Sequence, residues 1–208
     1  MHIPDGFLST EIWILMWIIT LAVMALAFKK TGKKLGDKQV PLMGILAAFI
    51  FAAQMLNVPV LGGTSGHFLG GVLAAILLGP YTASIIMASV FFVQALIFQD
   101  GGLTALGANI FNMGLLGTIV GYYIYVFIKK ASKNMFVAAG TAAWLVIMLA
   151  ATATSLELAA SGISPLALVL PAMLIIHAMI GVVEAAISVS VLGLIKKSRP
   201  DLLKLEKI

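Results

Sequence analysis

Long uninterrupted apolar runs constrain the fold of this chain more than any other feature. A helix needs about 20 apolar residues to cross roughly 30 Å of hydrocarbon. Six runs qualify as crossings: 12–28, 40–56, 81–98, 103–128, 135–156 and 167–195. The composition agrees, because 62% of the 208 residues are hydrophobic and 10% are charged, whereas about 25% of a soluble domain is charged. The sequence therefore predicts an all-α membrane protein.

The distribution of basic residues determines how a seventh, shorter apolar run at 67–78 is interpreted. By its length this run could be a crossing or a re-entrant segment. All thirteen Lys and Arg residues fall within 29–38, 129–133 and 196–207, and such stretches stay in the cytoplasm. An even number of crossings must then separate the first two stretches, so the short run must cross. We expect seven transmembrane helices, with the N-terminus outside and the C-terminus in the cytoplasm.

This topology predicts a single transmembrane domain over residues 1–208. It comprises an extracellular tail at 1–11, a seven-helix bundle at 12–195 and a cytoplasmic tail at 196–208. The first eleven residues lack the basic n-region of a signal peptide, and no A-x-A-like cleavage site precedes the first span. We therefore expect the encoded N-terminus to persist in the mature chain.

Small residues spaced four apart predict where helices approach closely. Gly117 and Gly121 form one such pair, and Ala48 and Ala52 form another. We expect the glycines to pack inside the bundle. The alanines could also face a partner subunit.

Several classes of function are excluded or disfavoured. The chain has no cysteine, so it has no disulfide and no thiolate metal site. It also has no Walker A sequence, so ATP hydrolysis would need another chain. Ser65 and His67 could be mistaken for a nucleophile and its base, but no positioned acid or G-x-S-x-G elbow accompanies them. We expect a binding or transport protein rather than an enzyme.

The outer face of this topology suits a cation. It carries acidic residues without any Lys or Arg, namely Asp5, Glu11, Asp100 and the helix-end residue Glu157. An alternative is that this asymmetry merely mirrors the topology signal, because the positive-inside rule alone produces it.

The first two residues predict a chelating site for a transition metal. Met1 and His2 offer three nitrogens: the terminal amine, the His2 backbone nitrogen and the His2 imidazole. Tetragonal nitrogen sites are typical of Ni(II) and Cu(II). His67 lies at the outer end of its run and could supply a fourth nitrogen. The alternatives are that His2 is an unremarkable second residue and that His67 is a helix-end histidine bonded to a carbonyl.

Polar residues inside the apolar runs indicate either function or helix pairing. Four carboxamides fall in the outer halves of their runs, namely Gln54, Gln94, Asn109 and Asn112. They could line an outward-facing cup, or they could bond between helices without a ligand. His177 and Glu184 lie seven apart on one helix face and could form a proton relay or a structural pair.

Two segments carry a resemblance to a known family. The N-terminal string MHIPDGFLS and the later string GGTSGHFLGG strongly resemble the substrate-capture membrane subunit (S component) of nickel and cobalt energy-coupling-factor ABC importers, the CbiM/NikM family. The resemblance covers the length of the chain. It implies that nickel(II) or cobalt(II) is the transported substrate and that Met1, His2 and His67 are the metal ligands.

The resemblance also implies partners and a location. It implies two cytoplasmic ATPase subunits, a transmembrane coupling subunit and in some systems a small accessory membrane subunit, all in a prokaryotic cell membrane. The chain would then bind its ion at the outer face and release it inside when its partners hydrolyse ATP. The alternative function is a proton-coupled secondary transporter that uses His177 and Glu184.

Overall fold

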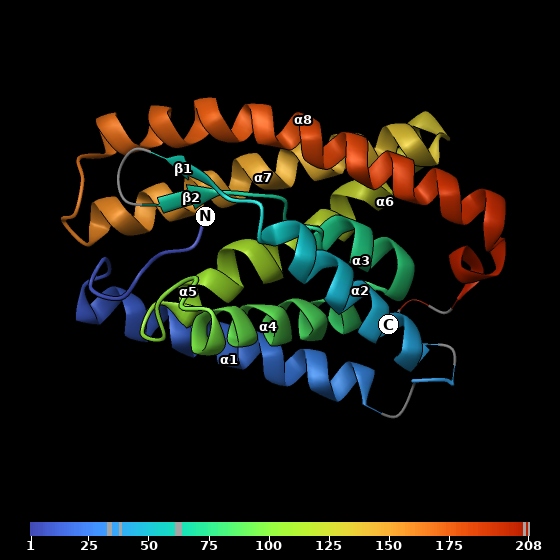
Figure 1. Ribbon diagram of the computed structural model, residues 1–208, viewed down its shortest axis with the longest axis horizontal. Coiled ribbons are helices and arrows are strands. Elements are labelled where there is room, and N and C mark those ends of the chain that lie inside the picture. Colours follow the sequence, from blue (N-terminus) through green and yellow to red (C-terminus); the bar gives the residue numbers. More distant parts are fainter. Residues whose placement is uncertain (33–34, 38, 61–63, 206, 208) are drawn as a thin grey trace.

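A computed structural model describes residues 1–32, 35–37, 39–60, 64–205 and 207. Its helices pack side by side into an elongated bundle, with a small β-hairpin near one end (Figure 1). Five helical stretches are long and apolar enough to cross a membrane: α1 (Thr10–Thr31), α4 (Pro80–Ile97), the continuous stretch Leu106–Ser132, α7 (Met135–Ala160) and α8 (Leu166–Ser198). The chain is therefore a multi-pass membrane protein, as its composition predicts.

The stretch Leu106–Ser132 changes its winding along its length. It begins with a short α-helix, α5 (Leu106–Asn109), continues as a π-helix, η1 (Ile110–Val120), and ends as α6 (Gly121–Ser132). A π-helix is rare and is frequently found at functional sites, because the wider turn re-aims the side chains that flank it. Here Asn109 and Asn112 lie at the start of the π-helical segment.

The remaining apolar segments are shorter. Helix α2 (Gln39–Gln54) has 16 residues. Strands β1 (Val58–Val60) and β2 (Thr64–Gly66) follow it and pair antiparallel, with Val58 opposite Gly66. Helix α3 (Gly71–Leu78) has eight residues, and every one of them is buried. Helix α3 is apolar all round because other helices enclose it.

The prediction of a transmembrane helix over 67–78 needs a correction. Residues 67–70 are not helical, and only Gly71–Leu78 form a helix. Gly70 has a φ of 80°, which a helix cannot contain. Irregular backbone at membrane depth must find polar partners within the protein. The Glu184 carboxylate of α8 supplies them, since it accepts bonds from the Leu69 and Gly70 amides at 2.6 and 2.9 Å.

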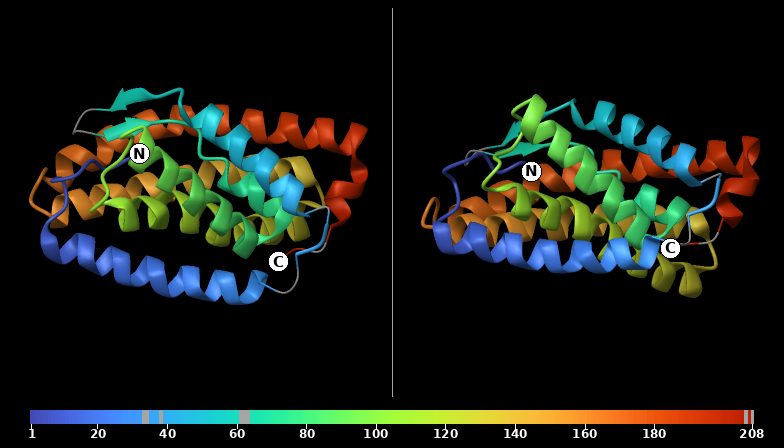
Figure 2. Two further views of the ribbon diagram at one scale, coloured as in Figure 1. Left: turned by 60° about the horizontal axis from the view of Figure 1, so that its bottom comes forward. Right: turned by 90° about the horizontal axis from the view of Figure 1, so that it is seen from below.

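The basic stretches gather at one end of the bundle, which we call the basic end. The last turns of α1, α6 and α8 carry lysine pairs at 29–30, 129–130 and 196–197. These helix ends lie together, at the right in Figure 1, and the 3₁₀-helix η2 (Pro200–Lys204) lies there too. The N-terminus lies near the opposite end in every view (Figures 1 and 2). The number of full crossings and the direction of insertion stay predictions.

The predicted packing of Gly117 and Gly121 is confirmed. A Cβ on Gly71 of α3 would lie 2.9 Å from the Gly117 carbonyl carbon, and a Cβ on Gly121 would lie 2.7 Å from Val72. These glycines therefore allow α3 to touch the backbone of η1. Ala48 and Ala52 are exposed on α2, which leaves them available for lipid or for a partner.

We predict that Gly71→Ala destabilises the bundle. Its new methyl group would overlap the Gly117 backbone, and such overpacking costs about 1–3 kcal/mol. Gly44→Ala in α2 is the matched control, because a Cβ at Gly44 would meet nothing within 4 Å. Thermal unfolding in detergent should show a lower midpoint for Gly71→Ala alone, and equal midpoints would contradict this account of the α3–η1 contact.

Candidate metal centre

The N-terminal tail folds back into the bundle rather than extending from it. Met1 and Ile3 are fully buried, although both belong to the chain terminus. Asn109 holds the backbone of Ile3 on both sides: the Ile3 amide donates to Asn109 Oδ1 at 2.8 Å, and Asn109 Nδ2 donates to the Ile3 carbonyl at 3.1 Å. The Gly102 amide also donates to that carbonyl at 2.9 Å. These bonds fix the position of the preceding residue, His2.

Asp5 anchors the next part of the tail. Its carboxylate accepts bonds from the Leu103 amide at 3.1 Å, the Thr104 amide at 2.7 Å and the Thr104 hydroxyl. Burial raises the pKa of Asp5, but these bonds outweigh it and hold the pKa below its ordinary value. The Phe7 amide donates to the Pro4 carbonyl, which closes the turn that the Pro-Asp-Gly sequence predicts.

His2 and His67 meet inside the protein. Their rings stack with centroids 4.6 Å apart and planes 23° apart, and their exposed fractions are 4% and 2%. Phe91 packs edge-on against the His2 ring at 5.6 Å. Residues that are 65 positions apart in the chain thus bring two imidazoles and the terminal amine into one buried region.

The bonds of His67 indicate its tautomer. Its Nδ1 lies 2.7 Å from the carbonyl oxygen of Phe68, which can only accept, so Nδ1 carries the proton. In a neutral imidazole the lone pair then lies on Nε2. Nε2 is buried and has no hydrogen-bond partner among the described residues. The carbonyl bond given above as an alternative role of His67 is present. Backbone carbonyls also make such bonds to metal-bound histidines.

A chain of carboxamides leads from Leu69 to the His2 ring. Gln54 Nε2 donates to the Leu69 carbonyl at 2.7 Å, which turns its oxygen toward Gln94. Gln94 Nε2 donates to that oxygen at 2.9 Å, so Gln94 Oε1 faces His2 Nε2 at 3.1 Å. The bond to Gln94 favours the tautomer with the proton on Nε2 and the lone pair on Nδ1, whereas the Asp100 carboxylate beside Nδ1 favours the opposite tautomer. Nδ1 is the atom that closes a six-membered chelate ring with the His2 backbone nitrogen.

The electrostatics of this region favour a cation bound by neutral nitrogens. Burial lowers the pKa of the Met1 amine to about 4, against the opposing effect of Asp100. Burial and the neighbouring amine likewise lower the pKa of His2 to about 4. Metal binding requires such deprotonated nitrogens. The Asp100 carboxylate lies 3.2 Å from His2 Nδ1 and adds negative charge beside them.

Glu184 and His177, both buried on α8, bond to different groups. The Glu184 carboxylate holds the Leu69 and Gly70 amides, so it fixes the segment that begins with His67. His177 Nδ1 donates to the Met173 carbonyl, one turn earlier in α8, at 2.7 Å. These bonds give Glu184 a structural role that requires no proton relay.

The open cup predicted from the four carboxamides is wrong in detail. All four are at most 1% exposed, because the N-terminal tail and neighbouring helices cover them. The tail is bonded by Asn109, and the His2 ring is bonded by Gln94, which Gln54 holds in turn. Asn112 Nδ2 instead donates to Glu157 at 2.6 Å and to Thr154 at 3.3 Å. Glu157 is therefore a buried partner of Asn112 and does not line an acidic mouth.

Side chains alone do not make a metal site here. Among the described residues, no group of three or more His, Asp or Glu side chains could hold an ion. A site with four nitrogen ligands would need the Met1 amine and the His2 backbone nitrogen in addition to the imidazoles of His2 and His67. The side chain of Ser65, the nucleophile considered and rejected above, lies outside the described part of the structure.

We predict that Asn109→Ala loosens the tail. It removes both bonds to Ile3, and the loss of buried hydrogen bonds should speed amide exchange in residues 1–8 by about tenfold or more. Hydrogen–deuterium exchange measured by mass spectrometry tests this. Asn112→Ala removes an equally buried amide that bonds to α7 instead, so equal acceleration in both variants would disprove the role of Asn109.

Comparison with known proteins identifies relatives of this chain. Residues 2–202 match the family model described as CbiM, cobalt uptake substrate-specific transmembrane region. A putative fused nickel transport protein NikMN of Archaeoglobus fulgidus is 45% identical over 98% of this chain and 68% of its own length. A putative metal transport protein of Haloquadratum walsbyi is 40% identical over 97% of this chain and 93% of its own.

A solved structure shares the fold. A crystal structure of a transition metal transporter superposes with a TM-score of 0.89 at 38% identity, and the match covers 95% of this chain and 93% of that one. The match of the family model over nearly the whole chain, the identity of full-length relatives and this superposition lead to one assignment. The chain belongs to the CbiM family of cobalt uptake substrate-specific transmembrane proteins.

Proposed function

We propose that this chain is the substrate-capture subunit of an ATP-driven importer and that it binds nickel(II) or cobalt(II) near the N-terminal end. The ligands are the Met1 amine, the His2 backbone nitrogen, His2 Nδ1 and His67 Nε2. The observation that carries the proposal is the buried stacking of His2 on His67 at 4.6 Å. The relatives named for nickel and cobalt transport support the choice of substrate.

The donor set supports a d-block ion that accepts four nitrogens. With its proton on Nε2, toward Gln94, the neutral His2 ring carries its lone pair on Nδ1, and His67 carries its lone pair on Nε2. Binding through a backbone nitrogen displaces its proton, which Ni(II) promotes far better than Mg(II) or Zn(II). Nickel ranks above cobalt on the Irving–Williams order and copper ranks higher still, so metal supply and site geometry must add selectivity.

The buried location supports capture rather than catalysis. The named relatives are transport proteins, and the chain has no ATP-binding motif of its own. We therefore assign ATP hydrolysis to two cytoplasmic ATPase subunits, which act through a transmembrane coupling subunit. With the basic end in the cytoplasm, the centre faces the outer side.

A residue added before Met1 should abolish nickel binding. It converts the coordinating amine into an amide and pushes extra atoms into a fully buried position. Isothermal titration of the purified protein with nickel should lose its signal in this extended form, and also in His2→Ala and His67→Ala. A residue added after Ile208 is the control and should change nothing. Unchanged affinity in the N-terminally extended form would refute the proposed ligand set.

Gln94→Leu should weaken nickel binding without removing a ligand. The change removes the acceptor that holds the proton of His2 on Nε2, and losing such an outer partner typically costs about 10- to 100-fold in metal affinity. The control is Asn112→Leu, which removes a buried amide at the same end of the bundle. If both variants bind nickel equally well, the carboxamide chain does not control the tautomer of His2.

A further inference from the structure

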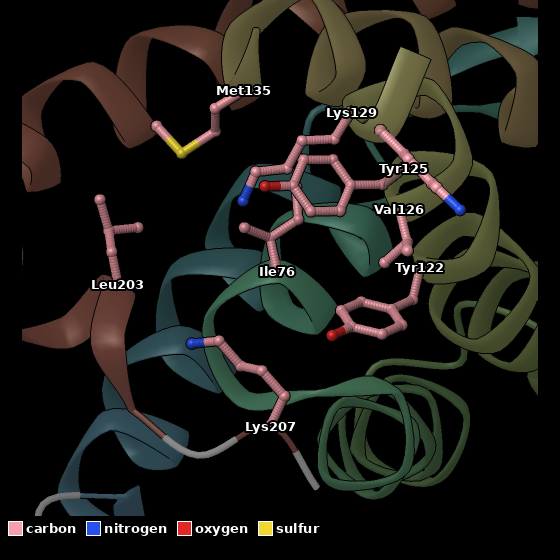
Figure 3. A pocket seen from close by; sticks show the side chains of 9 residues that line it. Ile76, Tyr122, Tyr125, Val126, Lys129, Met135, Leu203 and Lys207 are labelled. Atoms are coloured by element: carbon pink, nitrogen blue, oxygen red, sulfur yellow. The ribbon is translucent and has the colours of Figure 1, made fainter. Parts of the chain in front are cut away.

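A cavity of about 570 Å³ lies at the basic end, far from the candidate metal centre. We call it the tyrosine–lysine pocket. Figure 3 shows the ammonium groups of Lys129 and Lys207 and the hydroxyls of Tyr122 and Tyr125 directed into it. Lys130 also lines the pocket, and apolar side chains form the rest of its wall, namely Ile76, Val126, Met135 and Leu203.

The pocket concentrates positive charge, because lysines line it. Lys207 Nζ donates to the Leu77 carbonyl at 2.7 Å, which caps the last turn of α3. Burial and the nearby Lys129 lower the pKa of Lys207 to about 8. Within the described part of the chain, the ion pairs join His2 to Asp100 and Arg199 to Asp201, so neither pocket lysine is paired there. An anion between the two ammonium groups would relieve their repulsion.

A second cavity adjoins the pocket, and an apolar groove lies on the other face of α6. A second cavity of about 450 Å³ shares Tyr122 and Lys207 with the pocket and adds Lys29 and Lys30 of α1. Its wall also includes Tyr123, which in turn lines a groove of about 560 Å³ along the outer face of α6. The remaining residues that line this groove are all apolar, namely Ile119, Val120, Ile124, Phe127, Ile128 and Leu145.

The lining of the pocket suits an anionic phospholipid. Lysine ammonium groups and tyrosine hydroxyls can donate hydrogen bonds to a phosphate. The pocket also has an apolar wall of Ile76, Val126, Met135 and Leu203, which suits the first part of an acyl chain. A soluble phosphate would contact only the polar groups of the pocket. Basic pockets between transmembrane helices on the cytoplasmic side suit the head groups of anionic lipids.

We propose that the tyrosine–lysine pocket binds the head group of an anionic phospholipid, with the first part of an acyl chain against the apolar wall of the pocket. Lys129 and Lys207 hold the phosphate from opposite sides, and Tyr122 and Tyr125 donate hydrogen bonds to it. The bound lipid bridges α3, α6 and the C-terminal tail, which meet at this pocket. The site is independent of the metal ligands at the other end of the bundle.

Native mass spectrometry tests the proposal on the full-length protein. Detergent-purified protein is incubated with equal amounts of phosphatidylglycerol and phosphatidylcholine that carry identical acyl chains, and the bound lipids are compared. Wild-type protein should retain phosphatidylglycerol selectively. The preference should fall by about fivefold for each lysine removed in Lys129→Gln and in Lys129→Gln/Lys207→Gln. Lys129→Arg should keep the preference, because it preserves the charge.

The control is Lys196→Gln/Lys197→Gln, which removes the same charge from the last turn of α8. An equal loss of preference in the control would overturn the proposal, because net charge alone would then explain it. Retained preference in the pocket variants would also overturn it. The Lys129→Gln variant alone decides the matter if the double variant fails to fold, since Lys129 is exposed.

Two further arms distinguish other occupants. Glycerol 3-phosphate is added as a soluble phosphate: displacement of the bound lipid by equimolar glycerol 3-phosphate would assign the pocket to a free anion instead. Co-purification with the coupling subunit and ATPases is measured for the same variants. Loss of the complex with unchanged lipid preference would assign the pocket to a protein partner and reject the lipid.

Discussion

The two hydrogen bonds from the Leu69 and Gly70 amides to the Glu184 carboxylate are the constraint on which the rest of the structure depends. They satisfy backbone groups that would otherwise require a helix at this depth. The chain can therefore enter the bundle in extended form and begin α3 only at Gly71. His67 stands at the head of this extended segment, so a bond that solves a problem of membrane folding also places an imidazole inside the protein.

The same requirement explains why the N-terminal tail can be buried. A chain end carries polar groups that cost several kcal/mol when they are buried without partners. Asn109 and Gly102 bond the Ile3 backbone, and the carboxamides of Gln54 and Gln94 connect Leu69 to the His2 ring. The loop segment at 67–70 and the tail thus share one polar network, which makes the orientation of one histidine dependent on the backbone that carries the other.

The sequence predicted the long helices well, since each depends on a local apolar run that hydropathy identifies. The predicted topology and the family resemblance also placed His2 and His67 on one face. The sequence could not predict the break at 67–70, because the carboxylate that stabilises this break lies 115 positions away from Leu69. The role of Asp100 beside His2 Nδ1 and the direction of the Gln54–Gln94 chain also depend on side chains from different helices. No pattern within one segment encodes such pairings.

The tail carries three of the four proposed nitrogens within its first two residues, whereas the bundle carries the fourth. Any movement that breaks the hold of Asn109 and Asp5 on the tail would withdraw these three donors together and leave a single imidazole behind. The residence time of the ion would then depend on an equilibrium between a docked and an undocked N-terminal tail.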